Sequence, residues 1–278
     1  MGGTVPVEIR DSVFDVRTGG PEKGPAVLLL HGFPENATMW DGVAPALHAA
    51  GLRTVAPDQR GYSPGARPAA VADYAMRHVV ADTLGLLDAL GLDAVHVLGH
   101  DWGAAVAWHL AGRHPQRVRT LTAVSVPHPA AHAHALHTDP DQQQRSGYIT
   151  VFRRPDAEQL LLADDARRLR RMLRPLPDAT VDAFVRPLAE PGALTGPLNW
   201  YRAMSGADLD GLGPVTVPTT YVWGTEDIAV GRAAAAACAG HVDADYRFVA
   251  LPGVGHWVPE LEPGTVAREA LARISGPR

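Results

Sequence analysis

Residues Val95–Gly103 read VHVLGHDWG and lead directly into the helix-like segment Ala104–Arg113. The opening run favours a strand buried on both faces. A buried strand, a tight turn and a helix are typical of a nucleophile elbow, which exposes one reactive side chain at the end of the strand. That side chain here is Asp101, and Gly99 and Gly103 supply the small flanking residues that the turn needs.

The same segment allows a second interpretation of Asp101. An aspartate before a helix is a common N-cap, a role that needs no catalysis. As a nucleophile, the carboxylate would gain from the helix N-terminus, where the dipole favours the ionised form. The choice between the two roles depends on the residues elsewhere in the chain that could act with Asp101.

Short apolar runs alternate with helical patterns along much of the chain. Such alternation predicts an α/β fold with a mostly parallel, doubly wound sheet and ligands at the carboxyl ends of the strands. The expected helices end at Gly51 and Gly91. The expected strands are Ala26–Leu30, Thr54–Ala56, Val95–Leu98, Leu121–Val126, Tyr221–Trp223 and Phe248–Leu251.

The alternation stops between about His128 and Gly213, where the pattern is helical, rich in arginine and interrupted by prolines. We therefore expect one α/β core domain formed by residues 1–127 and 214–278, with residues 128–213 inserted as a helical cap. A length of 278 residues suits one such domain with an insertion.

A literal match to the serine elbow G-x-S-x-G occurs at Gly61–Gly65. The residue after the nucleophile must donate its backbone N–H to the oxyanion, and Pro64 has none. No helical pattern follows at once either. The sequence therefore disfavours Ser63 as a nucleophile.

Partners for Asp101 follow other predicted strands. Phe33, after Ala26–Leu30, and Trp102 are expected to supply the two oxyanion N–H groups. Asp227 follows Tyr221–Trp223, and His256 lies in a glycine-flanked segment after the last strand. The order nucleophile, acid, histidine is that of the α/β-hydrolase fold, in which Asp227, or Glu226 in its place, would orient His256.

Composition excludes several classes of function. The formal net charge of −5 and the pI of about 6.2 give no broad electrostatic attraction to nucleic acid or an anionic membrane. No run approaches the roughly 18 apolar residues of a membrane span. The single cysteine, Cys238, excludes an intrachain disulfide and favours the cytoplasm.

A group of histidines in the expected cap could chelate a metal. The residues are His128, His132, His134 and His137. They lack a convincing carboxylate nearby, so we expect no metal site there.

These motifs resemble the epoxide hydrolases of the α/β-hydrolase fold, of the soluble bacterial type without a phosphatase domain. The likeness spans nearly the whole chain and rests on the segments His31–Glu35, Asp58–Tyr62 and His100–Gly103, and on two cap segments, Ser146–Pro155 and Gly196–Arg202. Ser63-Pro64-Gly65 departs from the glycine and later serine of many relatives, which leaves the geometry of that loop open.

The resemblance implies a two-step reaction without a cofactor. Tyr148 and Tyr201 would hydrogen-bond the epoxide oxygen while Asp101 attacks a ring carbon, and a phenol, with an ordinary pKa near 10, stays protonated at neutral pH. His256 would then activate water to hydrolyse the ester, with His31 and Glu35 in support. The expected product is a vicinal diol.

Two other functions remain open at this stage. A haloalkane or haloacid dehalogenase also uses an aspartate nucleophile, but Phe33 lacks the side-chain donor that haloalkane enzymes usually place there. A non-catalytic ligand-binding member of the fold would keep the pocket alone. The expected substrate is a small or medium apolar epoxide, and the oligomeric state is left open, with a homodimer as one option.

Overall fold

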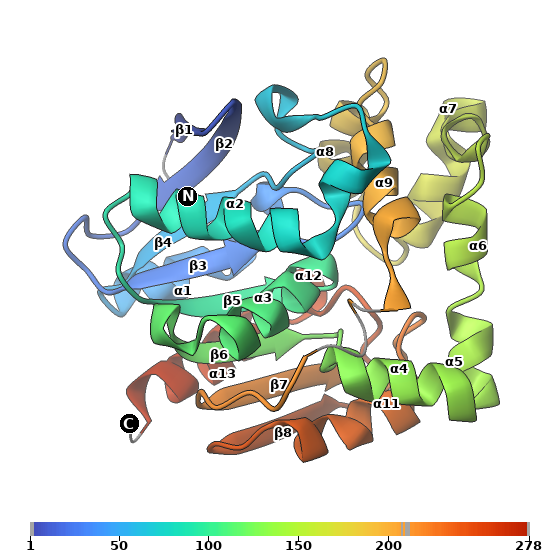
Figure 1. The fold of residues 1–278 in the computed structure, drawn as a ribbon. Helices are drawn as coiled ribbons and strands as arrows, with labels where there is room; N and C mark the ends of the chain where they lie inside the picture. The colour runs from blue at the N-terminus through green and yellow to red at the C-terminus, as the bar shows by residue number, and fades with distance from the viewer. Residues whose placement is uncertain (1–2, 207, 209–211, 277–278) are drawn as a thin grey trace.

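The computed structural model describes residues 3–206, 208 and 212–276 and is built around one eight-stranded sheet (Figure 1). The strand order is β1-β2-β4-β3-β5-β6-β7-β8. Strand β2 runs antiparallel to both of its neighbours, β1 and β4, and the strands from β3 to β8 run parallel to one another. The mostly parallel sheet predicted from the sequence is confirmed. The strands are β1 (Thr4–Ile9), β2 (Ser12–Gly19), β3 (Ala26–Leu30), β4 (Arg53–Pro57), β5 (Val95–His100), β6 (Val118–Val124), β7 (Thr219–Gly224) and β8 (Tyr246–Leu251).

Helices cover both faces of the sheet, as a doubly wound fold requires. One face carries α2 (Met76–Ala89), α3 (Trp102–Arg113) and α11 (Arg232–Ala237). The other carries α1 (Ala44–Ala49), α12 (Val258–Leu261) and α13 (Pro263–Ser275). Short 3-10 turns complete the connections: η1 (Ala37–Gly42), η2 (Pro64–Ala66), η3 (Val71–Tyr74), η4 (Pro115–Arg117) and η5 (Cys238–His241).

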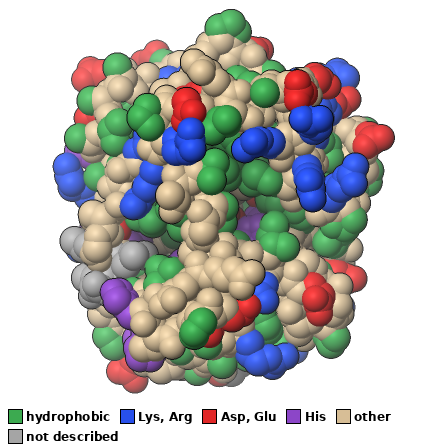
Figure 2. All heavy atoms as spheres, turned by 90° about the vertical axis from the view of Figure 1, so that its right-hand side faces the viewer, with side chains coloured by type: hydrophobic (Ala, Val, Ile, Leu, Met, Phe, Trp, Pro, Cys, Tyr) green, Lys and Arg blue, Asp and Glu red, His purple; other side chains and the backbone are tan. Residues whose placement is uncertain are grey.

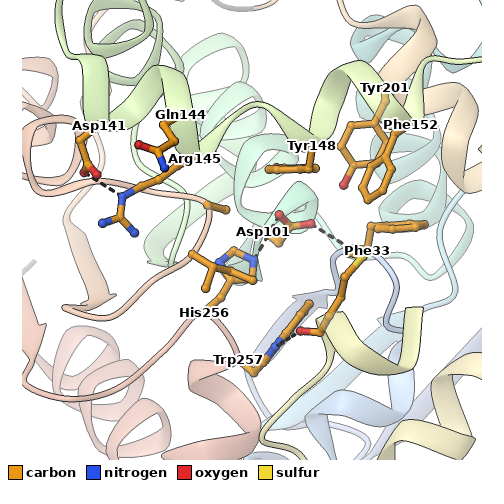
Figure 3. Close-up of a pocket in the computed structure, with 13 residues that line it drawn as sticks. Phe33, Asp101, Asp141, Gln144, Arg145, Tyr148, Phe152, Tyr201, His256 and Trp257 are labelled. Atoms are coloured by element: carbon orange, nitrogen blue, oxygen red, sulfur yellow. Dashed lines mark hydrogen bonds and ion pairs between the residues drawn. The ribbon is translucent and has the colours of Figure 1, made fainter. Parts of the chain in front are cut away.

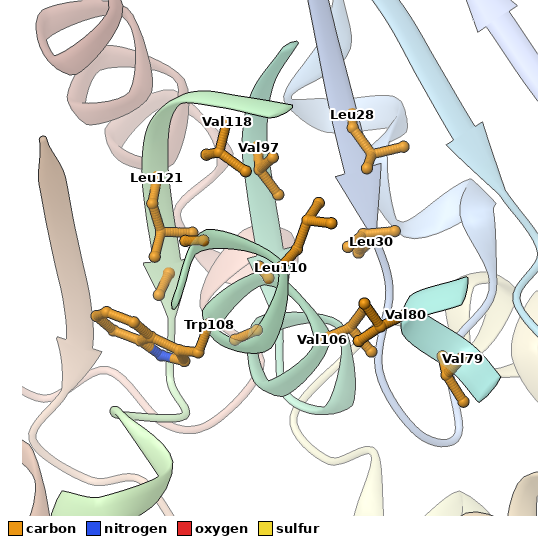
Figure 4. Close-up of a cluster of buried hydrophobic side chains, with 14 of the residues drawn as sticks. Leu28, Leu30, Val79, Val80, Val97, Val106, Trp108, Leu110, Val118 and Leu121 are labelled. Carbon is orange, nitrogen blue, oxygen red and sulfur yellow. The ribbon is translucent and has the colours of Figure 1, made fainter. Parts of the chain in front are cut away.

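Alternate residues of each central strand enter different apolar clusters. Leu28, Leu30 and Val97 pack against Leu110 under α2 and α3, and the fully buried Trp108 lies at the other end of the same cluster (Figure 4). Val27 and Leu29, on the same strand, face the opposite cluster. Burial on both faces explains why these strands read as continuous apolar runs in the sequence.

The described residues between β6 and β7 contain six helices, which we call the cap helices. They are α4 (Pro129–Thr138), α5 (Pro140–Arg145), α6 (Tyr148–Phe152), α7 (Ala157–Met172), α8 (Asp178–Leu188) and α9 (Thr195–Ala203). The described residues between 128 and 213 contain no strand. Residues 207 and 209–211 of the predicted cap lie outside the described residues.

The cap helices pack closely on the rest of the molecule, namely the sheet with its connecting helices and turns, which we call the sheet side. One apolar cluster contains both Leu29 and Trp40 of the sheet side and Phe184 and Leu198 of the cap helices. In addition, the Trp257 indole N–H donates to the Met172 carbonyl over 3.0 Å. The cap helices therefore share a core with the sheet.

Local predictions from the sequence can now be compared with the observed strands and helix ends. The antiparallel pair β1 and β2 was not singled out, because each strand lies at or near the sheet edge and alternates between buried and exposed residues. The expected strand ending at Val126 stops at Val124, since Ser125 has a φ of 66°. Gly51 and Gly91 end helices with φ values of 80° and 65°, as predicted.

The face that carries the cap helices is hollowed at its centre and bears many arginines (Figure 2). Arg170 lies 2.6 Å from Asp182, and Arg202 lies 2.8 Å from Glu158. These ion pairs suit the solvated surface expected of an arginine-rich segment. In the part of the chain that the structure describes, no helix is long and apolar enough to cross a membrane.

Candidate active site

Asp101 lies between the end of β5 and the start of α3, as expected for an elbow. Its φ of 51° and ψ of −120° are unusual for a residue other than glycine. A Cβ at Gly103 would overlap the Leu30 carbonyl, so only glycine lets the turn approach β3 so closely. The Asp101 side chain accepts no capping hydrogen bond from α3, which argues against the simple N-cap interpretation.

The loop after β3 brings a backbone donor to this carboxylate. The Phe33 N–H donates to Asp101 Oδ1 over 2.9 Å. A Cβ at Gly32 would overlap the Asp101 side chain, so glycine at this position permits the contact. Among the described hydrogen bonds to Asp101, none comes from the Trp102 N–H, and the oxyanion role of Trp102 stays a prediction.

His256 and Asp227 meet beside Asp101. The His256 Nδ1 lies 2.9 and 2.8 Å from the two Asp227 carboxylate oxygens, and its Nε2 lies 3.5 Å from Asp101 Oδ2. The backbone N–H groups of Ala229 and Val230 both donate to Asp227 Oδ1, at 2.7 and 3.0 Å. Glu226 is exposed, so Asp227 is the carboxylate that faces the histidine.

The charges of the three groups reinforce one another. Burial opposes the charge on His256, but the carboxylates of Asp227 and Asp101 outweigh burial and raise the His256 pKa well above its ordinary value. Burial also opposes the charge on Asp101, yet the hydrogen bond and charge of His256, together with the Phe33 N–H, lower the Asp101 pKa. Asp101 is thus held as a carboxylate.

Tyr148 of α6 and Tyr201 of α9 lie across the pocket from His256, on the other side of Asp101 (Figure 3). Their ring centroids are 6.2 Å apart, and Tyr201 also contacts Phe152 and Phe33 edge to face. Burial and the Asp101 charge raise the pKa of both phenols far above the usual range. Both therefore remain hydrogen-bond donors at neutral pH.

These side chains surround a pocket of about 520 Å³ that opens to the surface. Its mostly apolar wall suits an uncharged organic molecule. The lining residues are Phe33, Asp101, Asp141, Gln144, Arg145, Tyr148, Phe152, Met172, Tyr201, Ile228, Ala229, His256 and Trp257.

His31 supports the loop that carries Phe33 and does not line this pocket. Its Nε2 accepts from the Gln59 N–H at 3.0 Å, and its Nδ1 lies 2.9 Å from the Gly32 carbonyl. Burial is the main cause that lowers the pKa of His31. A neutral ring then donates through Nδ1 and accepts through Nε2, which matches both contacts.

Glu35 is fully buried behind the site. Its Oε2 lies 2.8 Å from His100 Nδ1, and the His100 Nε2 lies 2.9 Å from the His256 carbonyl oxygen. A carbonyl only accepts, so His100 must donate through Nε2. Burial lowers the pKa of His100 and raises that of Glu35 to about 7, and the protonated form of Glu35 can donate a hydrogen bond to Nδ1 of the neutral His100.

Some contacts that hold the site were not identified from the sequence. Besides His100, the Ser125 hydroxyl donates to the His256 carbonyl over 2.8 Å. Arg145 of α5 donates to the Asp227 carbonyl. Glu260, which is buried near Glu35, was also missed. Only His100 had a sequence signal, because it lies next to Asp101 in the elbow.

Ser63 and the cap histidines lie outside this arrangement. The buried Ser63 hydroxyl donates to the Asp58 carbonyl over 2.6 Å and accepts from the Asp15 N–H, which is a structural role. His128 accepts from the Ala130 N–H and caps α4. Among the residues that the structure describes, no three His, Cys, Asp or Glu side chains are grouped to hold a metal ion.

Known proteins resemble this chain in sequence and structure. The model of the alpha/beta hydrolase fold family matches residues 25–263. Epoxide hydrolase A of Mycobacterium tuberculosis is 35% identical, with 92% of each chain covered, and AB hydrolase superfamily protein YfhM of Bacillus subtilis is 34% identical, with 90% of each covered. The crystal structure of Epoxide Hydrolase A from Mycobacterium thermoresistibile has a TM-score of 0.86 at 30% identity, covering 99% of this chain and 98% of that one. The predicted fold and resemblance are confirmed: the chain belongs to the epoxide hydrolase family of the α/β-hydrolase fold and is a hydrolase.

Proposed function

We propose that this protein converts an epoxide to a vicinal diol through an ester formed on Asp101. The observation that carries this proposal is the position of one buried carboxylate between a histidine–aspartate pair and two phenols that line the pocket. Two relatives at 30% identity or more are named epoxide hydrolases, and their names support the same reaction. Residues 1–127 and 214–278 would form the core domain, and residues 128–213 the cap.

In the first step, an Asp101 carboxylate oxygen attacks one carbon of the epoxide and the ring C–O bond breaks. The released oxygen takes a proton from Tyr148 or Tyr201 while the other phenol donates a hydrogen bond to it. Because an alkoxide is a poor leaving group, this proton transfer lowers the barrier. The products are a hydroxyalkyl ester of Asp101 and one tyrosinate.

Formation of the ester prepares His256 for the second step. The Asp101 charge contributes to the raised pKa of His256 in the free protein. Esterification removes this charge, so the His256 pKa falls, and the ring releases its proton to solvent and becomes a base. It takes a proton back from solvent when the Asp101 carboxylate forms again. Asp227 remains at Nδ1, which leaves Nε2 free to take a proton from water.

The activated water then attacks the ester carbonyl carbon. The Phe33 N–H, and by prediction the Trp102 N–H, would stabilise the negative oxygen of the tetrahedral intermediate. Collapse of the intermediate breaks the ester bond, and the diol oxygen takes the proton from His256. The new Asp101 carboxylic acid returns a proton to the tyrosinate, so one epoxide and one water give one diol.

The pocket also indicates a substrate class. Its aromatic wall and volume of about 520 Å³ suit a small or medium apolar epoxide. Arg145 at the mouth is paired with Asp141 at 2.8 Å and donates to the Asp227 carbonyl. No anionic substrate group is therefore required to satisfy this cation.

The test is a mass measurement on the variant His256→Gln, which should form the ester without hydrolysing it. Intact-protein mass after exposure to epoxides should rise by one whole epoxide, and peptide mapping should place the adduct on Asp101. A gain equal to an alkyl group, after exposure to haloalkanes, would instead identify a dehalogenase. The absence of any adduct, with no turnover by the unmodified protein, would favour a ligand-binding function.

A further inference from the structure

Two cavities meet at Asp101. Besides the wide pocket, a second and narrower cavity of about 70 Å³ is lined by Asp101, Tyr148 and Tyr201 from its own side. These three residues are the ones that both cavities share. An epoxide carbon held at Asp101, with its oxygen towards the phenols, can therefore extend one substituent into each cavity.

The narrow cavity is mostly apolar. Its walls include Met76, Ala105, Val126, Pro127, Ile149 and Met204. By the volume that one water needs, it has room for about four or five water-sized groups. Such a space admits a short substituent and excludes a long chain or a second aromatic ring.

His132 of α4 brings a buried polar atom without a described hydrogen bond to this wall. Two other polar groups of this wall are engaged, because His109 Nε2 lies 2.9 Å from the Asp208 carbonyl and Asp208 Oδ2 accepts from Ser205. By contrast, His132 Nε2 is buried without a hydrogen bond among the described residues. A buried polar atom left unpaired costs about 1–3 kcal/mol, which a ligand atom can recover.

The surroundings of His132 define the kind of ligand atom. Burial lowers the pKa of His132 to about 4, so at neutral pH the ring is uncharged and offers one donor and one acceptor. The negative charges of Asp227 and Asp101 reach the same ring. A carboxylate would be repelled there, whereas a neutral hydroxyl or ether oxygen would not.

We propose that the narrow cavity is a subsite for a short substituent that carries one neutral oxygen, and that His132 recognises this oxygen. The substrates favoured are then epoxides with a hydroxymethyl or similar group on one ring carbon and a larger apolar group in the wide pocket. This inference rests on the proposed function and assigns a specificity-determining residue to it.

The test compares two epoxides that differ in one group. In trans-2,3-epoxy-1-hexanol a hydroxyl stands where trans-3,4-epoxyheptane has a methyl group. For each protein, we take the ratio of kcat/KM for the epoxy alcohol to kcat/KM for the epoxyheptane. In His132→Leu this ratio should fall about tenfold, as expected for the loss of one buried hydrogen bond. His132→Gln, which keeps a donor and an acceptor, should restore most of the ratio.

His134→Leu provides the matched control, because His134 lies on the same helix and is exposed. This variant should leave the ratio unchanged. Since both substrates are measured on one protein sample, partial unfolding of a variant cancels in the ratio. An unchanged ratio in His132→Leu, with both epoxides hydrolysed, would overturn the subsite while leaving the proposed function intact.

A crystal structure of Asp101→Asn with the epoxy alcohol gives a second test. The hydroxyl should lie within about 2.7–3.2 Å of a His132 ring nitrogen. An alcohol group in the wide pocket would contradict the proposal. If the unmodified protein opened no epoxide at all, the proposed function itself would fail, which is a different result from an unchanged ratio.

Discussion

The candidate site contains an ionised carboxylate on the sheet side and neutral phenols on the cap side. Asp101 is ionised because His256 and the Phe33 N–H stabilise its charge, and Asp227 receives two backbone N–H groups. Tyr201 is buried and Tyr148 is partly buried, but both lie among aromatic rings, and their pKa values rise. Burial alone therefore does not decide the charge of a group; the donors and charges around it do.

The largest effect should come from removing the charge on the sheet side. Asp101→Asn lacks the anionic nucleophile, and we expect kcat for epoxide hydrolysis to fall by about 10⁴-fold or more. Ser63→Ala is the control, because Ser63 occupies the other elbow-like motif and only supports its loop. Its kcat should change little, and full activity of Asp101→Asn would disprove the nucleophile assignment.

The next effect tests the orientation of the histidine. Asp227→Asn removes the negative charge from His256 Nδ1, and kcat should fall by about 10²–10⁴-fold. The exposed neighbour Glu226 offers the matched change Glu226→Gln, which should keep nearly full activity. Steady-state kinetics on both variants decide the matter, and a larger loss for Glu226→Gln would reverse the assignment.

On the cap side, each phenol is expected to contribute separately. Tyr148→Phe and Tyr201→Phe each lose one donor to the ring oxygen, and each should lower kcat/KM by about 10²-fold. The double variant should lose more than either single variant. Rapid-quench measurement of ester formation would locate the defect, and a loss confined to ester hydrolysis would contradict the ring-opening role.

A smaller effect concerns stability and involves Glu35. Its pKa is raised from 4.5 to about 7 by burial, so the folded protein binds this proton more tightly than the unfolded chain. The stabilisation is complete below pH 4.5 and is lost as the pH rises through about 7, by an amount on the order of 3 kcal/mol.

The variant Glu35→Gln cannot ionise and should therefore show a flatter stability profile. Urea unfolding at pH 5 and pH 8 should reveal a smaller difference in the free energy of unfolding than for the unmodified protein. Glu22→Gln, at an exposed position, serves as the control and should behave as the unmodified protein does. Equal pH dependence in Glu35→Gln and the unmodified protein would show that Glu35 is ionised throughout.

The sequence predicted the sheet side more fully than the cap side. Doubly buried strands such as β3 and β5 leave continuous apolar runs, and the glycine-containing motifs that follow these runs locate Phe33 and Asp101. Tyr148 and Tyr201 have no comparable local signal, and only the family resemblance selected them among six tyrosines. Asp227 was preferred over Glu226 by motif position alone.

Contacts between distant segments could not be predicted. His100, Ser125 and Glu260 meet around the His256 segment only after β5, β6 and the C-terminal region come together. The unpaired nitrogen of His132 likewise depends on packing rather than on sequence spacing. The cytoplasmic location stays a prediction and the oligomeric state stays open, since neither depends on any contact described above.

The apolar cluster shared by the sheet side and the cap helices limits how this enzyme can be engineered. Leu29 and Trp40 pack in one continuous interior with Phe184 and Leu198, and Trp257 is bonded to Met172. A chimaera that receives the cap of a relative would also need the matching residues of the sheet side. Heating should accordingly unfold the cap helices and the sheet side in one transition. For the same reason, substrate range is better altered by point substitutions along the pocket walls than by exchange of the whole cap segment.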